Sequence, residues 1–195
     1  TLFQEIEAQG GMVAALQAGL PQQWVAATAV ARTTNLAKRK AVLVGVNQYA
    51  NVGEPVAVNS KRSSVSGEQS PIANLQIAPI QPIRLAEPFE ALRDWSEAYG
   101  VRHGRRPQIF LANMGPLRQH KARADFTRGF FEVGGFEILD SGGFEGVATA
   151  VAAALAANAP AVVICSTDDT YPALVPPLVQ SIKAQKPDAV VLLAG

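Results

Sequence analysis

The sequence has few of the residue types on which many functional sites depend. Its 195 residues include one cysteine and two histidines, which excludes an internal disulfide and a zinc site built from paired cysteines. The single thiol, Cys165, is compatible with a reducing cytoplasm, and its apolar surroundings predict an inert core residue. No Ser-His-Asp set, Cys-His pair or Gly-rich phosphate loop is found, so the sequence supports neither nucleophilic catalysis nor dinucleotide binding.

An excess of one charge and long apolar runs are also missing. With 17 basic and 16 acidic residues the net charge is +1, which gives no reason to expect a nucleic acid or an anionic membrane as partner. The longest stretch of low polarity, Val147 to Ala157, is shorter than the roughly 20 residues that span a bilayer. No signal peptide is expected from the first residues. Because the chain begins without Met and ends on an apolar run, we expect a fragment of a longer protein.

The C-terminal half alternates between apolar runs and helical patterns. Predicted strands cover residues 109–112, 136–139, 161–166 and 189–193, with helices between them. This alternation predicts an α/β domain with an open, doubly wound, parallel sheet of the flavodoxin type. A fifth strand and helix, which such a domain normally has, are absent, so we expect the domain to be truncated.

One βαβ unit, residues 108–138, organises this half. An apolar strand ends at Asn113, and the helix that follows carries apolar residues at spacings of four, four and three: Ala122, Phe126, Phe130 and Val133. Residues with this spacing share one helix face, and Gly134-Gly135 is expected to end the helix. Ligands of parallel sheets bind at the carboxyl ends of strands. The loop at 113–121 is therefore the expected ligand site.

The N-terminal half is expected to be helical and then extended. The patterns predict a helix over residues 1–19 that Gly10-Gly11 interrupts, a second helix from Pro21 to Ala37, and a β-like run at 41–46. Residues 51–86 are polar and proline-rich, as is typical of a linker. A short helix over 87–99 follows, and its apolar stripe (Phe89, Leu92, Trp95 and Tyr99) is expected to pack in the core.

Several of these stretches resemble one family. The sequences ANMG at 112–115 and QHKARADFTRGFFEVGGFEI at 119–138 look like the cobalamin-binding domain of methylmalonyl-CoA mutase, and more closely like that of its small, non-catalytic subunit. LFQEIEAQGGM at 2–12 and VGVNQY at 44–49 resemble the end of the (β/α)8 barrel that precedes this domain. The resemblance implies three parts: a barrel remnant (1–50), a linker with a short helix (51–106) and a cobalamin-binding-like domain (107–195).

The chain departs from the family where the cofactor would bind. The family's Asp-x-His-x-x-Gly loop, whose histidine binds cobalt, falls on Leu117, Gln119 and Ala122, just after Gly115. His120 lies one position too late, and a slip of one residue rotates a helical side chain by about 100°. We therefore expect His120 to be a solvent-facing or helix-start residue that does not bind cobalt.

Residues on the other side of the implied pocket also differ from those of the family. Ser166-Thr167 matches the family beside the nucleotide tail of cobalamin, but Asp168 follows where an apolar residue is usual, and Ala194-Gly195 replaces a Gly-Gly pair. A carboxylate in an apolar slot costs several kcal/mol unless it is paired. Five altered positions around one pocket predict that cobalamin binding is lost. Mg²⁺ binding by Asp168 and Asp169 is a weaker alternative.

The resemblance implies a role in interconverting (R)-methylmalonyl-CoA and succinyl-CoA by a radical rearrangement that uses adenosylcobalamin. This chain would be the structural small subunit of a cytoplasmic heterodimer, without catalytic residues or a bound metal. The large catalytic subunit would hold the cofactor and the acyl-CoA. Two alternatives stay open: a cobalamin-binding acyl-CoA mutase that uses a shifted His120, and a stand-alone flavodoxin-like interaction module.

Overall fold

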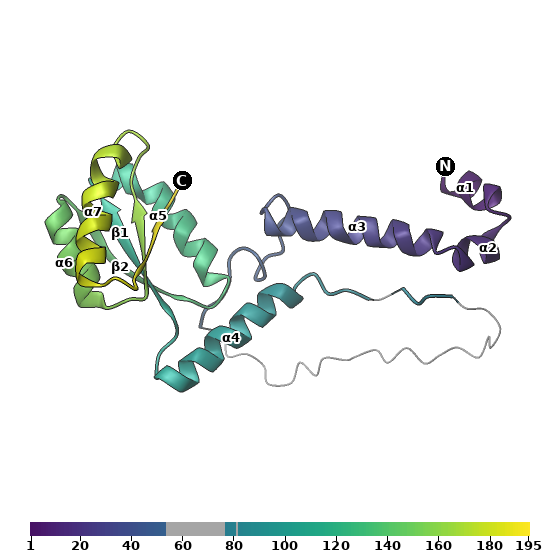
Figure 1. Ribbon diagram of the computed structural model, residues 1–195, viewed down its shortest axis with the longest axis horizontal. Helices are drawn as coiled ribbons and strands as arrows, with labels where there is room; N and C mark the ends of the chain where they lie inside the picture. Colours follow the sequence, from purple (N-terminus) through teal and green to yellow (C-terminus); the bar gives the residue numbers. More distant parts are fainter. Residues whose placement is uncertain (54–76, 81) are drawn as a thin grey trace. The chain divides into compact units, whose positions relative to one another are not determined.

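The described residues of the computed structural model form two compact units (Figure 1). Residues 1–53, 77–80 and 82–195 are described, so most of the predicted linker at 51–86 lies outside them. The N-terminal unit contains residues 1–41 and the described part of 54–85, and the C-terminal unit contains 42–53 and 86–195. No described helix is both long enough and apolar enough to cross a membrane.

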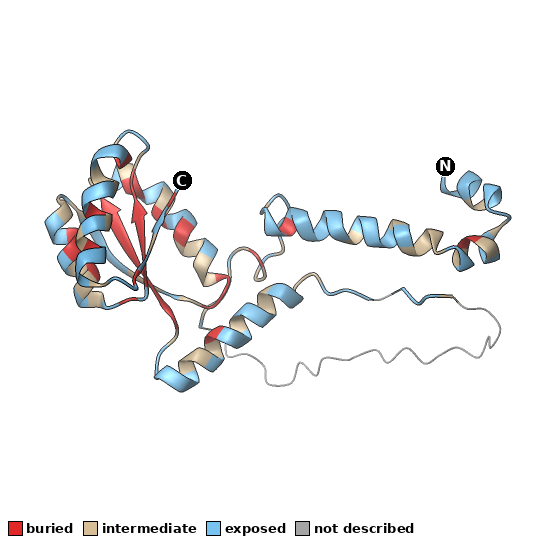
Figure 2. Cartoon of the chain, in the orientation of Figure 1, coloured by how far each residue is buried: buried red, intermediate tan, exposed pale blue. Residues whose placement is uncertain are grey.

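The N-terminal unit consists of three helices that bury little. They are α1 (Leu2–Ala8), α2 (Met12–Gln17) and α3 (Leu20–Ala37). Gly10 and Gly11 have φ angles of +92° and +98°, which glycine adopts without strain, so the predicted interruption of the first helix is confirmed. Among the described residues of this unit, only Ala15 and Leu36 are buried (Figure 2).

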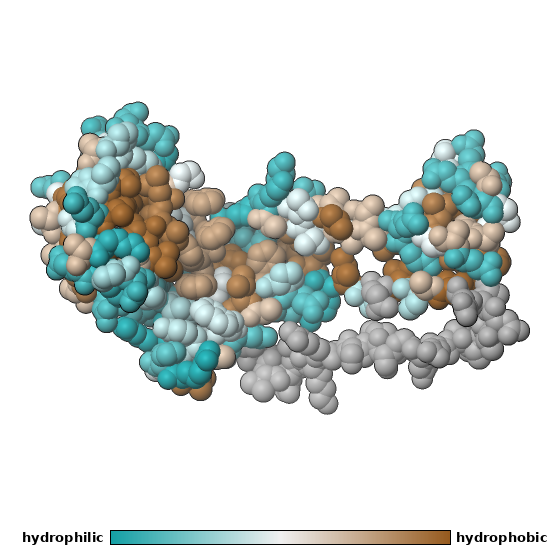
Figure 3. All heavy atoms as spheres, viewed as in Figure 1, coloured by the Kyte–Doolittle hydropathy of each residue, from teal (hydrophilic) through white to brown (hydrophobic). Residues whose placement is uncertain are grey.

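Large apolar side chains remain on the surface of this unit. The exposed large apolar residues of its helices are Leu2, Phe3, Met12, Val13, Val25 and Val30. Figure 3 shows apolar atoms at the surface around these helices. An apolar groove runs between α1, α3 and the segment that ends at Leu85, and Trp24, Val25 and Ile83 are among its lining residues. The helices are thus formed without a core of their own.

The predicted β-like run at 41–46 is wrong. This segment forms turns with a single bridge between Val44 and Gln48. Gly45 turns the chain with a φ of +76°, and the Asn47 side chain accepts a hydrogen bond from the Leu43 amide. This apolar segment therefore ends in a tight turn, since no strand among the described residues pairs with it.

Helix α4 (Glu87–His103) is four residues longer than the pattern predicted. It contacts the rest of the C-terminal unit through hydrogen bonds and through the rings of Trp95 and Phe136. Arg93 donates to the carbonyls of Val133, Gly45 and Val46, and the buried Ser96 hydroxyl donates to Gly135. The predicted core stripe is only partly buried: Leu92 and Trp95 are each 48% exposed, while Phe89 and Tyr99 are half-buried.

The sheet confirms the predicted topology. Its strands are β1 (Gln108–Met114), β2 (Glu137–Phe144), β3 (Ala161–Cys165) and β4 (Val190–Leu193). They lie in the order β2-β1-β3-β4, and each pairing is parallel. Strands β1 and β3 are buried at every position, as expected for central strands covered on both faces. The carboxyl ends of all four strands therefore meet at one edge.

Three helices cover the two faces of the sheet (Figure 1). Helix α5 (Leu117–Glu132) covers one face, and α6 (Val147–Ala157) and α7 (Tyr171–Gln185) cover the other. Alternate strand residues point to opposite faces, so Phe110 and Ile164 pack with α6 and α7, whereas Leu111 and Val163 pack on the side of α5.

Two of the apolar residues that share one face of α5 do not pack on the sheet. Phe126 and Phe130 are 52% and 53% exposed and stack on one another. The residues that face the sheet are His120, Ala124 and Thr127, which are all buried. The two polar side chains have partners there: His120 contacts the Gly115 carbonyl and Thr127 contacts the Cys165 thiol. Buried polar groups of this kind are tolerated when they are hydrogen-bonded.

Candidate functional site

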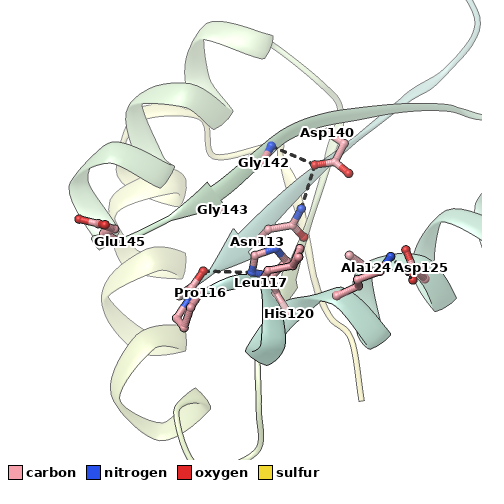
Figure 4. Close-up of a pocket in the computed structure, with 12 residues that line it drawn as sticks. Asn113, Pro116, Leu117, His120, Ala124, Asp125, Asp140, Gly142, Gly143 and Glu145 are labelled. Atoms are coloured by element: carbon pink, nitrogen blue, oxygen red, sulfur yellow. Dashed lines mark hydrogen bonds and ion pairs between the residues drawn. The ribbon is translucent and has the colours of Figure 1, made fainter.

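The end of β1, the loop after it, the first half of α5 and the C-terminal part of β2 line a cavity of about 500 Å³ at the carboxyl edge of the sheet (Figure 4). Its lining residues are Asn113, Gly115, Pro116, Leu117, His120, Lys121, Ala124, Asp125, Asp140, Gly142, Gly143 and Glu145. The cavity thus lies beside the loop at 113–121, where the topology predicts a ligand.

A polar network forms one wall of the cavity. The Nδ2 of Asn113 donates to Asp140 Oδ1 at 2.9 Å, and the Gly142 amide donates to the same oxygen at 3.0 Å. The other carboxylate oxygen, Oδ2, accepts from Arg128 at 2.7 Å. Asp140, in β2, therefore joins this strand to the end of β1 and to α5.

His120 also lines the cavity, from the first turns of α5. It is 4% exposed, so the expected helix-start position is confirmed and the expected solvent-facing orientation is wrong. Its Nδ1 lies 3.0 Å from the Gly115 carbonyl oxygen, and because a carbonyl only accepts, Nδ1 is the protonated nitrogen. Gly143 permits this packing, since a Cβ there would lie 2.9 Å from His120 Cε1 and 3.0 Å from the Gly115 oxygen.

The three positions of the loop motif lie in different environments. Leu117 is 65% exposed at the rim of the cavity, and Ala122 is exposed. Gln119 folds back over Gly115, where an added Cβ would lie 2.1 Å from its Oε1. Gly115 also has a φ of +77°, so both its backbone conformation and its neighbour favour glycine.

A second cluster lies at the ends of β3 and β4. Arg123 donates to the Ser166 carbonyl at 2.8 Å and to the Asp168 carboxylate at 2.7 Å, and its guanidinium lies over the ring of Tyr171. The hydrogen bond to Asp168, followed by one to Tyr171, raises the pKa of Arg123. The side chain of Asp168 is 82% exposed, so the predicted burial of its carboxylate in an apolar slot is wrong.

Tyr171 joins the ends of the two strands. Its hydroxyl donates to the carbonyl of Ala194 and accepts from the amide of Ser166. The Ser166 hydroxyl, itself buried, donates to the Met114 carbonyl and accepts from Thr170. Thr167 lies beside Thr170, and Gly195 is exposed. The polar groups of this cluster thus bond to one another.

The comparisons with known proteins agree on one family. Residues 1–86 match the sequence profile of the family described as methylmalonyl-CoA mutase. The methylmalonyl-CoA mutase small subunit of Porphyromonas gingivalis is 35% identical over 87% of this chain and 26% of its own length. The chain is a homologue of methylmalonyl-CoA mutase small subunits. The methylmalonyl-CoA mutase small subunit of Streptomyces virginiae is 34% identical over 87% of this chain and 26% of its own length. The chain thus spans about a quarter of the length of the relatives it matches.

The mutase family implies adenosylcobalamin, and the two clusters test whether this chain fits that cofactor. Gln119, at the position of the family's cobalt-binding histidine, has an amide that packs on Gly115. His120 is buried between its own loop and Gly143, so its imidazole is not exposed as a ligand. On the tail side, Arg123 is bonded across to Asp168. These residues do not fit a cobalamin that is bound through histidine.

Magnesium is no better supported in this mutase homologue. The carboxylate of Asp168 binds Arg123, and the described residues contain no group of three or more histidine, cysteine or acidic side chains that could hold a metal ion.

Among the residues of these clusters, Arg123, Asp140 and Tyr171 were not predicted as site residues, whereas Asn113 lies in the loop at 113–121 that was. Two signals in the sequence pointed to Asp140 and Arg123. Asn113 and Asp140 each follow an apolar strand, and parallel strands place such residues at one edge. An acid in the predicted tail pocket required a basic partner, which Arg123 provides.

Cys165 is expected to be unreactive in the folded mutase homologue. Burial raises the pKa of its thiol to about 11 from an ordinary 9.0, although the contact with Thr127 opposes the shift. At pH 9 the native thiolate population is then about 50-fold smaller than that of an ordinary thiol. Alkylation by iodoacetamide at pH 9 should be slower by at least this factor than in urea.

The same shift sets the sign of a pH dependence. The unfolded thiol loses its proton near pH 9 and the folded one near pH 11, so this group's contribution to stability is present below pH 9 and is lost as the pH rises to 11. Native alkylation within threefold of that of free glutathione would contradict the burial of Cys165.

Proposed function

We propose that this chain is part of the small subunit of a methylmalonyl-CoA mutase and that it acts structurally, without binding cobalamin. The observation that carries this proposal is the pair of neighbours at the start of α5. Gln119 occupies the position of the cobalt ligand, and the only nearby imidazole, that of His120, is 4% exposed and bonded to Gly115. An amide is a poor substitute for an imidazole as a transition-metal ligand.

The tail side of the pocket supports the same function. A nucleotide tail needs a crevice beside the ends of β3 and β4. Arg123 crosses this place and bonds to Asp168, with Tyr171 beneath it. Opening the crevice would break a charge-assisted hydrogen bond, which is stronger than a neutral one. Binding a nucleotide tail here would therefore cost free energy that binding in a glycine-lined pocket does not.

The partner would be a large catalytic subunit that holds adenosylcobalamin and the acyl-CoA. The cofactor supplies the radical chemistry of the interconversion of methylmalonyl-CoA and succinyl-CoA. The residues of this chain would contribute a contact surface and structural support to that large subunit. A cytoplasmic location is consistent with the single buried thiol. The proposed division remains a barrel remnant at 1–50, a linker at 51–106 and a cobalamin-binding-like domain at 107–195.

The test is the absorbance spectrum of hydroxocobalamin mixed with the chain. We expect no spectrum of histidine-ligated cobalamin and no cobalamin retained after gel filtration, because neither Gln119 nor the buried His120 offers a free imidazole at the right place. A cobalamin-binding mutase domain serves as the positive control.

His120→Ala separates this proposal from a shifted ligand. If the native chain shows a histidine-ligated spectrum that disappears in this variant, the chain binds cobalamin and the proposed function is wrong. Gln119→His adds the imidazole at the family's position. Because Leu117 and Ala122 still differ from the family, we expect this variant to bind no more than weakly.

A further inference from the structure

A continuous strip of aromatic rings lies on the surface of the C-terminal unit. It leads from α4 to α5 through Phe136, the residue before β2 (Figure 1). Neighbouring ring centroids lie 5.2 to 6.1 Å apart, a range in which aromatic rings attract one another. The rings of this aromatic strip are, in order, Tyr99, Trp95, Phe136, Phe131, Phe130 and Phe126. None of these rings is buried.

The packing of the sheet does not account for the two phenylalanines at the α5 end of the strip. The buried positions of α5 are held by His120, Ala124 and Thr127, while Phe126 and Phe130 are 52% and 53% exposed. Burying polar side chains and exposing aromatic ones reverses the usual preference. A contiguous apolar surface of this kind usually marks a contact site.

The residue types around the strip indicate a protein as the partner. Tyr, Trp, Phe and Arg are enriched in protein–protein interfaces. Asp94 and Asp125, both exposed, lie next to Trp95 and Phe126 in the chain, and their carboxylates disfavour a nucleic acid or an anionic membrane. Neither the cavity at the carboxyl edge of the sheet nor the apolar groove of the N-terminal unit is lined by a ring of the strip, so neither hollow extends the strip into a small-molecule site.

Free positive charge near both ends of the strip indicates the charge of the partner's surface. Arg102 and Arg105 lie at and just after the end of α4, and Arg118 lies in the first turn of α5. All three are exposed, and none has an ion pair within the described ranges. Of the two acids beside the rings, Asp125 is paired with Lys121. The contacting surface of the partner is therefore expected to be apolar with an acidic rim.

We propose that the aromatic strip binds the large subunit of the mutase, on a surface that is apolar at its centre and acidic at its rim. This inference rests on the proposed function, which supplies the large subunit, and it adds the surface through which the C-terminal unit contacts that subunit. Trp95, Phe130 and Phe126 are the anchors, since large aromatic side chains carry much of the binding energy in protein interfaces. The three free arginines steer the approach of the two subunits, because charges at a rim act mainly on the association rate.

The test titrates the large subunit with the full small subunit that contains this chain. The double variant Phe126→Glu with Phe130→Glu places two charges at the α5 end of the strip and should raise the Kd by about tenfold or more. Trp95→Ala removes an anchor from the other helix and should weaken binding in the same direction. Val101→Glu, at an 87% exposed apolar position of α4 outside the strip, should leave the Kd unchanged.

A charge variant and a folding control complete the test. Arg105→Glu with Arg118→Glu should slow association and make it less sensitive to salt. Thermal melting followed by circular dichroism identifies the variants that keep the native fold, and Trp95→Ala decides the matter if the double phenylalanine variant unfolds. The proposal is wrong if the folded strip variants bind as tightly as the native subunit, if Val101→Glu weakens binding equally, or if the strip variants abolish only self-association of the small subunit. A native subunit that binds no large subunit contradicts the proposed function itself, which is a distinct result.

Discussion

Produced alone, the 195-residue chain is expected to form large assemblies or to precipitate, and to stay in solution when it is co-produced with its full subunit and the large subunit. The reason lies in the N-terminal unit, where Phe3 is 80% exposed and Val30 is 67% exposed. Each large apolar side chain that a partner buries contributes about 1.5–3 kcal/mol. Contiguous apolar surface of this kind usually marks a protein contact. Sedimentation velocity over a wide concentration range measures the effect.

A matched pair of variants locates the cause. The double variant Phe3→Glu with Val30→Glu should shift the sedimentation profile strongly toward the monomer. Glu5→Ala with Arg32→Ala changes the same helices without removing apolar surface and should leave assembly intact. A wild-type chain that sediments as one compact monomer at all concentrations would overturn this expectation and would favour the stand-alone interaction module.

Replacing Arg93 by Ala should lower the free energy of unfolding of the C-terminal unit by about 2–4 kcal/mol. One guanidinium donates to three carbonyls, those of Val133, Gly45 and Val46, at 2.8, 2.8 and 2.9 Å. Its loss leaves three partly buried carbonyls without their donor. Urea unfolding followed by circular dichroism, together with hydrogen exchange at residues 43–47, measures the change.

Two control variants make the result specific. Arg93→Lys keeps the charge but not the fork of donors, so it should recover only part of the loss. Arg102→Ala removes another arginine of α4 whose one hydrogen bond is to Ala98 in the same helix, and it should change stability by less than about 0.5 kcal/mol. If Arg93→Ala leaves the amide protection of residues 43–47 unchanged, Arg93 does not hold that segment.

The strands were predictable because their burial is continuous. A central parallel strand is apolar at nearly every position, and β1 and β3 show this directly in the sequence. The orientation of α5 was not predictable in the same way. Phe126 and Phe130 repeat at helical spacing yet lie at the surface, while the buried positions hold polar His120 and Thr127. Their partners come from Gly115 and from β3, which no local pattern shows.

The position of the candidate site was predictable from the sequence, but the contacts between its residues were not. The topology alone located the loop at 113–121, and the cavity lies there. The bond between Arg123 and Asp168 joins residues that are 45 positions apart, and the bond between Asn113 and Asp140 spans 27. Pairs of this kind depend on which strand ends lie next to each other at one edge of the sheet. A single sequence shows residues that could pair, but not which pairs form.

The strand order has a consequence for the time course of folding. Strand β1 is central, and it pairs on one side with β2, where Ile109 meets Ile138, and on the other with β3, where Ile109 meets Ala161. The second pairing joins residues farther apart in sequence than the first, and contacts between distant residues slow folding because loop closure precedes any gain from pairing. During synthesis, β1 and β2 with α5 between them can therefore assemble before β3 has been made. Until then the edge of β1 that β3 later pairs with stays unpaired, and its apolar face that α6 and α7 later cover stays open. A nascent chain at this stage is a natural substrate for a chaperone.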